Sequence, residues 1–239
     1  MNIEYHVSVN GCDRAEGSRE NPFRTISRAA AIAETGDRVI VHEGVYREWV
    51  KPAHTGYSNI SRITYEAAEG EKVVIKGSER IQNWEQMEGT VWKAVVPNTL
   101  FGDYNPYQEI LGGDWFLYPC ADGPEGYCIH TGDVYLNGKS FFEAKSLEDV
   151  KNPVIRTEGY NPPWTKRTEP ILHPEDTVYQ WFAQVDEENT TIYANFQGAD
   201  PNKELVEINV RKCCFYPEKP GMNYITVRGF EMEQAACPW

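Results

Sequence analysis

The sequence predicts an all-β protein in which a parallel β-solenoid is interrupted by an antiparallel β-sandwich. Short runs of β-branched and other apolar residues, bounded by glycine and polar turns, occur at 39–41, 63–65 and 73–75. Such runs are typical of core strands in parallel sheets, which are buried on both faces. Between residues 78 and 203 the pattern changes to alternating strands separated by tight-turn sequences, which favours a sandwich.

The N-terminal region is predicted to contain one strand and one helix. Residues 4–10 alternate weakly and form the strand, and a polar loop follows. Asn21 is suited to cap a helix, and Pro22 is suited to its first position, where the missing N–H is not needed. Gly36 ends the helix, which would cover the open end of the solenoid. The apolar residues expected on its buried face are Phe23, Ile26, Ala30 and Ala33.

Two sequence relations indicate repeating coils and an insert between them. Ile40 and Ile63 lie 23 residues apart, a plausible solenoid repeat. Residues 75–77 (Ile-Lys-Gly) are echoed by residues 227–229 (Val-Arg-Gly), each with a β-branched residue, a basic residue and a glycine. The sequence between the two echoes is therefore predicted to be inserted into the solenoid.

The insert carries the signals of antiparallel hairpins. Asn137-Gly138 is a tight-turn pair, and residues 179–185 and 191–196 alternate on either side of a polar turn. The predicted boundaries are 1–78 for the cap and first coils, 79–204 for the inserted sandwich and 205–239 for the resumed, truncated solenoid.

The segment from Gly36 to Glu48 resembles the opening coil of right-handed parallel β-helix proteins of the pectate-lyase-like superfamily. Four longer blocks together resemble the N-terminal part of glycoside hydrolase family 120, the β-xylosidases. The blocks are residues 42–50 (HEGVYREWV), 66–81 (EAAEGEKVVIKGSERI), 191–201 (TIYANFQGADP) and 229–239 (GFEMEQAACPW). The resemblance implies a right-handed parallel β-helix with an N-terminal capping helix and a β-sandwich inserted into an early coil.

The same resemblance implies a retaining, exo-acting enzyme that releases xylose from short xylo-oligosaccharides through a covalent glycosyl-enzyme. The family's nucleophile Asp and acid/base Glu lie on later coils, and no position of this chain matches them. The catalytic carboxylates are therefore expected beyond residue 239, and this chain alone is expected to be inactive. The full-length protein is expected to be a homo-oligomer that needs no cofactor.

The net charge of −13 argues against a nucleic-acid partner, whose phosphates would be repelled, and it favours a neutral oligosaccharide over an anionic polymer. The chain has no apolar window long enough to span a membrane and no visible signal peptide. Its six cysteines lack metal-ligand spacing, and most are expected to be reduced thiols in a cytoplasmic protein. Cys120 and Cys128 flank a Gly/Pro loop, and whether they pair is left open.

Within the chain, Glu231 and Glu233 are weak catalytic candidates. They lie two residues apart on a predicted strand, so both side chains point to one face with Cα atoms about 7 Å apart. A retaining glycosidase needs two carboxylates across the scissile bond. In a chain with 36 acidic residues, however, two solvated surface charges are the more frequent outcome.

His42, Glu43 and Glu48 form a second candidate cluster. We expect His42 to be a hydrogen-bonded structural histidine at a coil corner, because no second titratable partner is identifiable by spacing. Glu48 is expected to pair with Arg47 or Arg62.

Residues 100–131 form a long segment with little strand pattern in which aromatic residues lie among carboxylates. Aromatic rings stack on the C–H faces of sugars, so Trp115 is a candidate substrate-binding residue, either here or for a neighbouring subunit. The alternative is a loop packed against its own sandwich.

Two other functions remain open at this stage. One is a non-catalytic glycan-binding β-helix protein. The other is a polysaccharide lyase on the same scaffold, which would need calcium-binding carboxylates and an anionic substrate that the net charge disfavours.

Overall fold

The computed structural model describes residues 2–111, 129–159 and 167–237. The regular secondary structure of the described chain is mostly strand, with two short α-helices, which confirms the all-β class. It divides into two compact units. The first comprises Met1–Ser78 and Arg211–Ala235, and the second comprises Glu79–Val210 and Ala236–Trp239.

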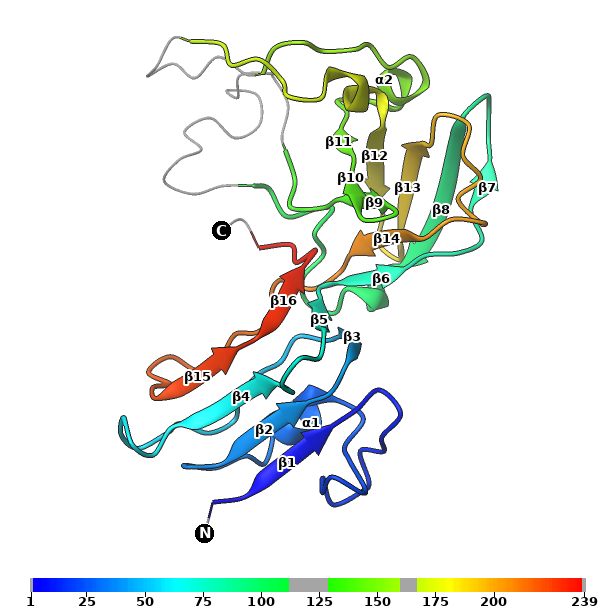
Figure 1. Ribbon diagram of the computed structural model, residues 1–239. Coiled ribbons are helices and arrows are strands. Elements are labelled where there is room, and N and C mark those ends of the chain that lie inside the picture. The colour runs from blue at the N-terminus through cyan, green and yellow to red at the C-terminus, as the bar shows by residue number, and fades with distance from the viewer. Residues whose placement is uncertain (1, 112–128, 160–166, 238–239) are drawn as a thin grey trace. The chain divides into compact units, whose positions relative to one another are not determined.

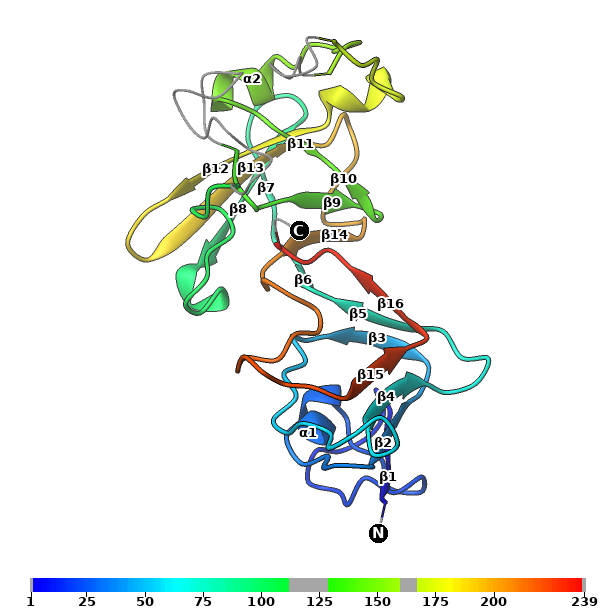
Figure 2. The same cartoon turned by 90° about the vertical axis from the view of Figure 1, so that its left-hand side faces the viewer.

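The first unit contains two parallel sheets, whose strands lie side by side in Figures 1 and 2. The four-stranded sheet has the order β1-β2-β4-β15, formed by Glu4–Val7, Arg38–Val41, Ile63–Ala67 and Ile225–Arg228. The three-stranded sheet has the order β16-β5-β3, formed by Phe230–Glu233, Val73–Lys76 and Gly44–Arg47. Every pairing in both sheets is parallel. Each pass of the chain therefore adds one strand to each sheet in turn.

The strand register corrects two relations read from the sequence. Ile40 lies opposite Glu66, so β2 and β4 are offset by 26 residues, and the predicted repeat of 23 is wrong. Arg228 lies opposite Glu66 in one sheet, whereas Lys76 lies opposite Glu233 in the other. Residues 75–77 and 227–229 are therefore not equivalent. Each pass of the chain supplies strands to two sheets. Residues 75–76 belong to one sheet and residues 227–228 to the other, although their sequences are similar.

Strand β2 is buried on one face only. Val39 and Val41 are fully buried, while Ile40 is partly exposed on the opposite face. The prediction that this strand is buried on both faces is wrong, because the outward face of the sheet carries polar side chains. The interior of the unit is filled by fully buried residues that include Val7, Ile26, Val39, Val41, Ile63, Tyr65 and Ile75.

Helix α1 (Ile26–Ala30) begins later than the sequence suggests. Its N-cap is Thr25, whose hydroxyl accepts a hydrogen bond from a backbone N–H in the first turn, so the prediction of Asn21 as the cap is wrong. Phe23 precedes the helix and forms a parallel bridge with Val7. The strand-like pairing of Phe23 outweighs the local helix signal of Asn-Pro.

The second unit also contains two sheets, which are mostly antiparallel. The five-stranded sheet has the order β11-β12-β13-β8-β7, formed by Phe142–Glu143, Gln180–Val185, Asn189–Asn195, Val91–Pro97 and Glu85–Gln86. The other has the order β10-β9-β14-β6, formed by Lys139–Ser140, Val134–Leu136, Val206–Asn209 and Ser78–Arg80. The only parallel pairing described in the five-stranded sheet is β11 with β12. The helical segments are η1 (Asn98–Leu100), α2 (Leu147–Lys151) and η3 (Pro174–Val178).

Both predicted hairpins are present. Asn137 and Gly138 have φ values of 52° and 84° between β9 and β10, as a type I′ turn requires at both central positions. Strands β12 and β13 pair antiparallel around a turn in which the Asp186 carboxylate accepts two backbone N–H groups. The local turn signals therefore located these strand ends correctly.

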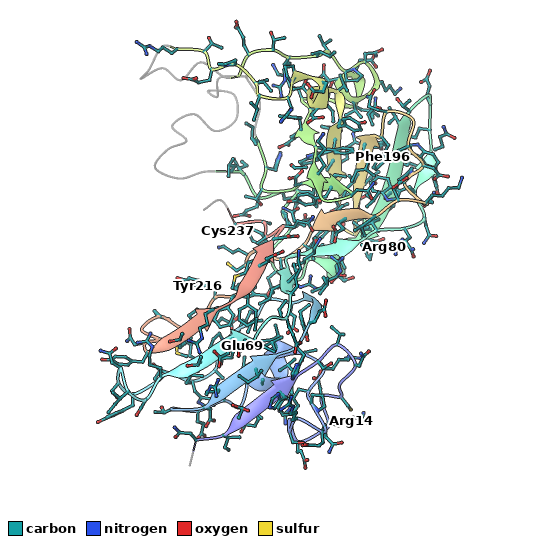
Figure 3. All side chains as sticks on the ribbon, in the orientation of Figure 1. Arg14, Glu69, Arg80, Phe196, Tyr216 and Cys237 are labelled. Atoms are coloured by element: carbon teal, nitrogen blue, oxygen red, sulfur yellow. The ribbon has the colours of Figure 1, made fainter. Side chains whose placement is uncertain are left out.

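Strand β14 differs from its predicted role as a solenoid strand. It pairs antiparallel with β9 inside the second unit, and the first unit takes up the chain again at Arg211 rather than at residue 205. The side chains of Val206 and Ile208 are fully buried there. They join a core that includes Trp84, Trp181, Ile192 and Phe196, the last of which is labelled in Figure 3.

The described part of the chain contains four cysteines, Cys12, Cys213, Cys214 and Cys237. Burial raises the pKa of the Cys214 thiol. Cys120 and Cys128 lie outside the described residues. Among the helices that the structure describes, none has the length and apolar character needed to cross a bilayer.

Candidate functional site

The outward face of the β1-β2-β4-β15 sheet carries an open depression of about 770 Å³. Side chains alternate along a strand, so Glu4 and His6 of β1 point to the same face. Polar residues from the neighbouring strands and turns complete the surface. Its charged and titratable lining includes Glu4, His6, Arg38, His42, Glu66 and Arg228.

Glu66 is the centre of an ion-pair ladder across the four strands. Its side chain is 8% exposed. Its Oε1 accepts a hydrogen bond from Arg38 Nε at 3.0 Å, and its Oε2 accepts one from Arg228 Nε at 2.5 Å. The Nη2 atom of each arginine contacts the same oxygen as its Nε. Arg38 Nη1 continues the ladder to Glu4 at 2.8 Å. Charges of opposite sign thus alternate from β1 to β15.

The ladder holds Glu66 in its ionised form. Burial pushes the pKa of Glu66 upward, but the hydrogen bonds from Arg38 and Arg228 outweigh it and lower the pKa overall. Both oxygens are already bound to guanidinium groups. Glu66 is therefore suited to joining strands and unsuited to proton transfer.

A chain of two hydrogen bonds and one ion pair joins four titratable residues beside the ladder. His6 Nδ1 lies 3.0 Å from His42 Nε2, and the two rings are tilted by only 14° with centroids 5.3 Å apart. That separation exceeds the nitrogen–nitrogen distance by roughly one ring diameter, so the rings meet end to end. At the outer ends, His42 Nδ1 lies 3.1 Å from Glu71 and His6 Nε2 lies 3.3 Å from Glu4.

Glu71 also accepts the backbone N–H of Glu43 at 2.6 Å. This hydrogen bond, together with that to His42, lowers the pKa of Glu71. His42 therefore has partners at both ring nitrogens, and Glu43 takes part through its backbone. The sequence placed His42 at a corner but contained no spacing that identified Glu71 or His6.

Glu48 is part of neither the ladder nor the histidine chain. Its carboxylate accepts Ile26 N at 2.9 Å and Ser27 N at 2.7 Å at the start of α1. The prediction that it pairs with Arg47 or Arg62 is wrong. The unpaired N–H groups at a helix start attract a carboxylate, and the fold brings Glu48 to them from the next pass of the chain.

Glu231 and Glu233 lie on β16, and each has a lysine partner. Glu231 pairs with Lys72 at 3.0 Å and Glu233 with Lys76 at 3.4 Å. The glutamate side chains are 51% and 43% exposed. Exposed pairs of this kind are a common feature of solvated surfaces.

The second unit contains a partly buried carboxyl group at Asp133. Burial raises its pKa to about 6, opposed by hydrogen bonds that include Ser140 Oγ at 2.5 Å and Val134 N at 2.7 Å. Nearby, Glu143 binds both the ring and the backbone N–H of His130, at 2.6 and 2.8 Å. These carboxylates connect strands to the loops that precede them.

One group of residues in the described chain has ligand atoms close enough to hold a metal ion. It comprises His173, Glu175 and Asp176, whose ligand atoms lie within 4.8 Å of one another at the start of η3. The group is largely exposed, and Asp176 forms an ion pair with Lys139 at 2.5 Å. Trp115, the predicted substrate-binding residue, lies outside the described residues.

Comparison with known proteins identifies the family. The family "Glycoside hydrolase 120, insertion domain" matches residues 81–208, which is more than half of the chain and nearly all of the second unit. The chain belongs to glycoside hydrolase family 120. A family described only as a protein of unknown function (DUF1565) matches residues 9–53.

Solved structures agree with this assignment to family 120. A complex of XylC with xylose is 57% identical and has a TM-score of 0.92, covering 99% of this chain and 36% of XylC. A second structure, described as a glycoside hydrolase, is 14% identical with a TM-score of 0.55 over 97% of this chain and 50% of its own, and it supports the fold alone. The uncharacterized protein YwoF of Bacillus subtilis (strain 168) is 41% identical over 80 residues, 34% of this chain and 17% of YwoF. The chain thus spans about a third of XylC and a smaller part of YwoF.

Proposed function

We propose that this chain is the N-terminal part of a retaining, exo-acting β-xylosidase that hydrolyses short xylo-oligosaccharides. The catalytic carboxylates lie beyond residue 239 in this proposal, and residues 1–239 supply the first coils of the scaffold and the insertion domain. The observation that carries the proposal is the 57% identity to XylC, whose structure contains xylose, over 99% of this chain.

The state of the carboxylates supports placing the catalytic pair elsewhere. A retaining glycosidase needs one carboxylate free to attack the sugar and a second able to donate a proton. Glu66 is bound on both oxygens by arginines, Glu71 by a histidine and a backbone N–H, and Glu231 and Glu233 by lysines. Each of these groups already has a structural partner.

The parallel sheets support a scaffold of the β-helix type. Two parallel sheets receive strands alternately from successive passes of the chain, which is the arrangement expected of right-handed β-helix coils. The antiparallel second unit, placed between β5 and β15 in the sequence, fits a sandwich inserted into an early coil. We include both features, and homo-oligomerisation of the full-length protein, in the proposal.

The test is hydrolysis of xylobiose and an aryl β-xyloside by the full-length protein, with the anomer of released xylose followed by NMR at early times. The proposal predicts that β-xylose appears first and mutarotates later. Initial formation of α-xylose would refute the retaining mechanism. Binding of xylobiose without turnover would favour a glycan-binding protein, and an unsaturated sugar product would favour a lyase.

A further inference from the structure

The chain of Glu4, His6, His42 and Glu71 joins three separate parts of the first unit. Glu4 and His6 lie on β1, His42 follows the end of β2, and Glu71 lies in the turn that leads into β5. The three contacts measure 3.3, 3.0 and 3.1 Å. Since these parts are distant in sequence, the side-chain contacts supplement the backbone pairing that holds β1 against β2.

The number of protons determines whether all three contacts are favourable. Each hydrogen bond needs one hydrogen between its two heavy atoms, because carboxylates only accept and each ring nitrogen either donates or accepts. Two neutral imidazoles carry two N–H groups, which are enough for the His6–His42 and His42–Glu71 hydrogen bonds. A third hydrogen, on one imidazolium, also gives His6 and Glu4 an ion pair at 3.3 Å.

A second excess proton has the opposite effect. With both rings charged, His6 Nδ1 and His42 Nε2 would each carry a hydrogen and would face each other at 3.0 Å. Two donors and two positive charges would then meet end to end. The pair relieves this arrangement by separating, and the loss of the side-chain contact weakens the attachment of β1 to the end of β2.

We propose that the His6–His42 pair is an acid-sensitive latch that stays closed while at least one ring is neutral and opens when both rings are protonated. The proposal concerns the first unit alone and is independent of the enzymatic activity proposed above. The opened state is one in which the N-terminal strand and the residues after β2 lose protection from solvent.

The surroundings of the pair agree with this assignment. Burial lowers the pKa of His6, the neighbouring His42 and Arg19 act in the same direction, and Glu4 opposes them. Glu71 faces His42 from the turn before β5. The other charged groups that line this depression are Arg38, Glu66, Glu69 and Arg228. Figure 3 labels Glu69 on the segment after β4.

The sign of the pH effect follows from the lowered pKa of His6. In the unfolded chain a histidine takes up its proton near pH 6.5, whereas in the closed latch His6 takes it up at lower pH. The stabilisation is therefore complete above about pH 6.5 and is lost as the pH falls toward the folded pKa. The further the fold lowers the pKa of His6, the larger is the change toward the open state on acidification.

The first experiment is an NMR titration of the imidazole resonances of the chain between pH 8 and pH 4.5. The latch predicts that His6 and His42 both report the same two separate steps, because they share protons, with the lower step below the ordinary histidine pKa. Replacement of His42 by glutamine should leave His6 with a single step. Two independent single-step titrations in the wild type would overturn the proposal.

The second experiment is hydrogen exchange of the amides in residues 4–8 and 40–44 at pH 7.5 and pH 5.0, corrected for the intrinsic pH dependence of exchange. Exchange in the wild type should rise severalfold at pH 5.0, and the rise should disappear in His42→Gln. His173→Gln is the matched control, because His173 is 64% exposed and lies in the other unit. An unchanged wild type, or an equal rise in His42→Gln, would refute the latch.

Discussion

Replacing Glu48 by alanine should destabilise the first unit by about 2 kcal/mol. The Glu48 carboxylate accepts two backbone N–H groups at the start of α1, at 2.9 and 2.7 Å, and the Ser27 hydroxyl at 2.5 Å. Loss of a capping side chain costs about 0.5–2 kcal/mol, and loss of a negative charge at a helix start costs about 0.3–1 kcal/mol. The hydroxyl contact is lost as well, which places the total near the upper part of this range.

The assay is thermal unfolding followed by calorimetry, with hydrogen exchange of residues 26–31 to assign the transition. For a unit of this size, about 2 kcal/mol corresponds to a fall of about 8 °C in the midpoint of the first unit's transition. Glu48→Gln keeps an acceptor without the charge and should lose about half as much. Glu43→Gln is the matched control, because the Glu43 side chain is exposed. A change below about 0.5 kcal/mol in Glu48→Ala would refute the stabilising role of the Glu48 carboxylate at the start of α1.

Two further predictions concern the second unit. The pKa of Asp133 is raised to about 6 in the folded unit, so folding favours the protonated carboxyl group. The contribution of this group to stability is therefore complete below about pH 4 and is lost as the pH rises through 6. Asp133→Asn should therefore stabilise the unit by about 2 kcal/mol more at pH 7.5 than at pH 4.5 in denaturant titrations, and an equal effect at both pH values would contradict the burial argument. Residues 79–210 expressed alone should fold, with a strand-rich circular dichroism spectrum and protected amides in β8 and β13, whereas rapid exchange throughout would show that the unit depends on the rest of the chain.

Local signals in the sequence predicted those parts of the fold that neighbouring residues determine. Asn137-Gly138 specified a hairpin because few other pairs tolerate positive φ at both positions. The apolar run at Val39 to Val41 located a core strand, but the polar outer face of its sheet was not recognised. The helix start was misplaced because Phe23 pairs with Val7, a contact that depends on tertiary structure.

The candidate site depended on register, which the sequence left undetermined. Glu66 contacts Arg38 and Arg228, which are 28 and 162 residues away in the chain. His42 meets His6 and Glu71 at separations of 36 and 29 residues. A predicted repeat of 23 residues could not have brought these residues together. The alternation of Glu4 and His6 on one strand face was the single local signal available.

The most direct test of the account is a comparison of purified residues 1–239 with the full-length protein, using hydrolysis of an aryl β-xyloside as the readout. The account places the catalytic carboxylates beyond Trp239, so it predicts turnover by the full-length protein and none by residues 1–239. Turnover by residues 1–239 that is abolished by Glu231→Gln or Glu233→Gln would contradict it, because the active site would then lie on β16, where both glutamates now have lysine partners.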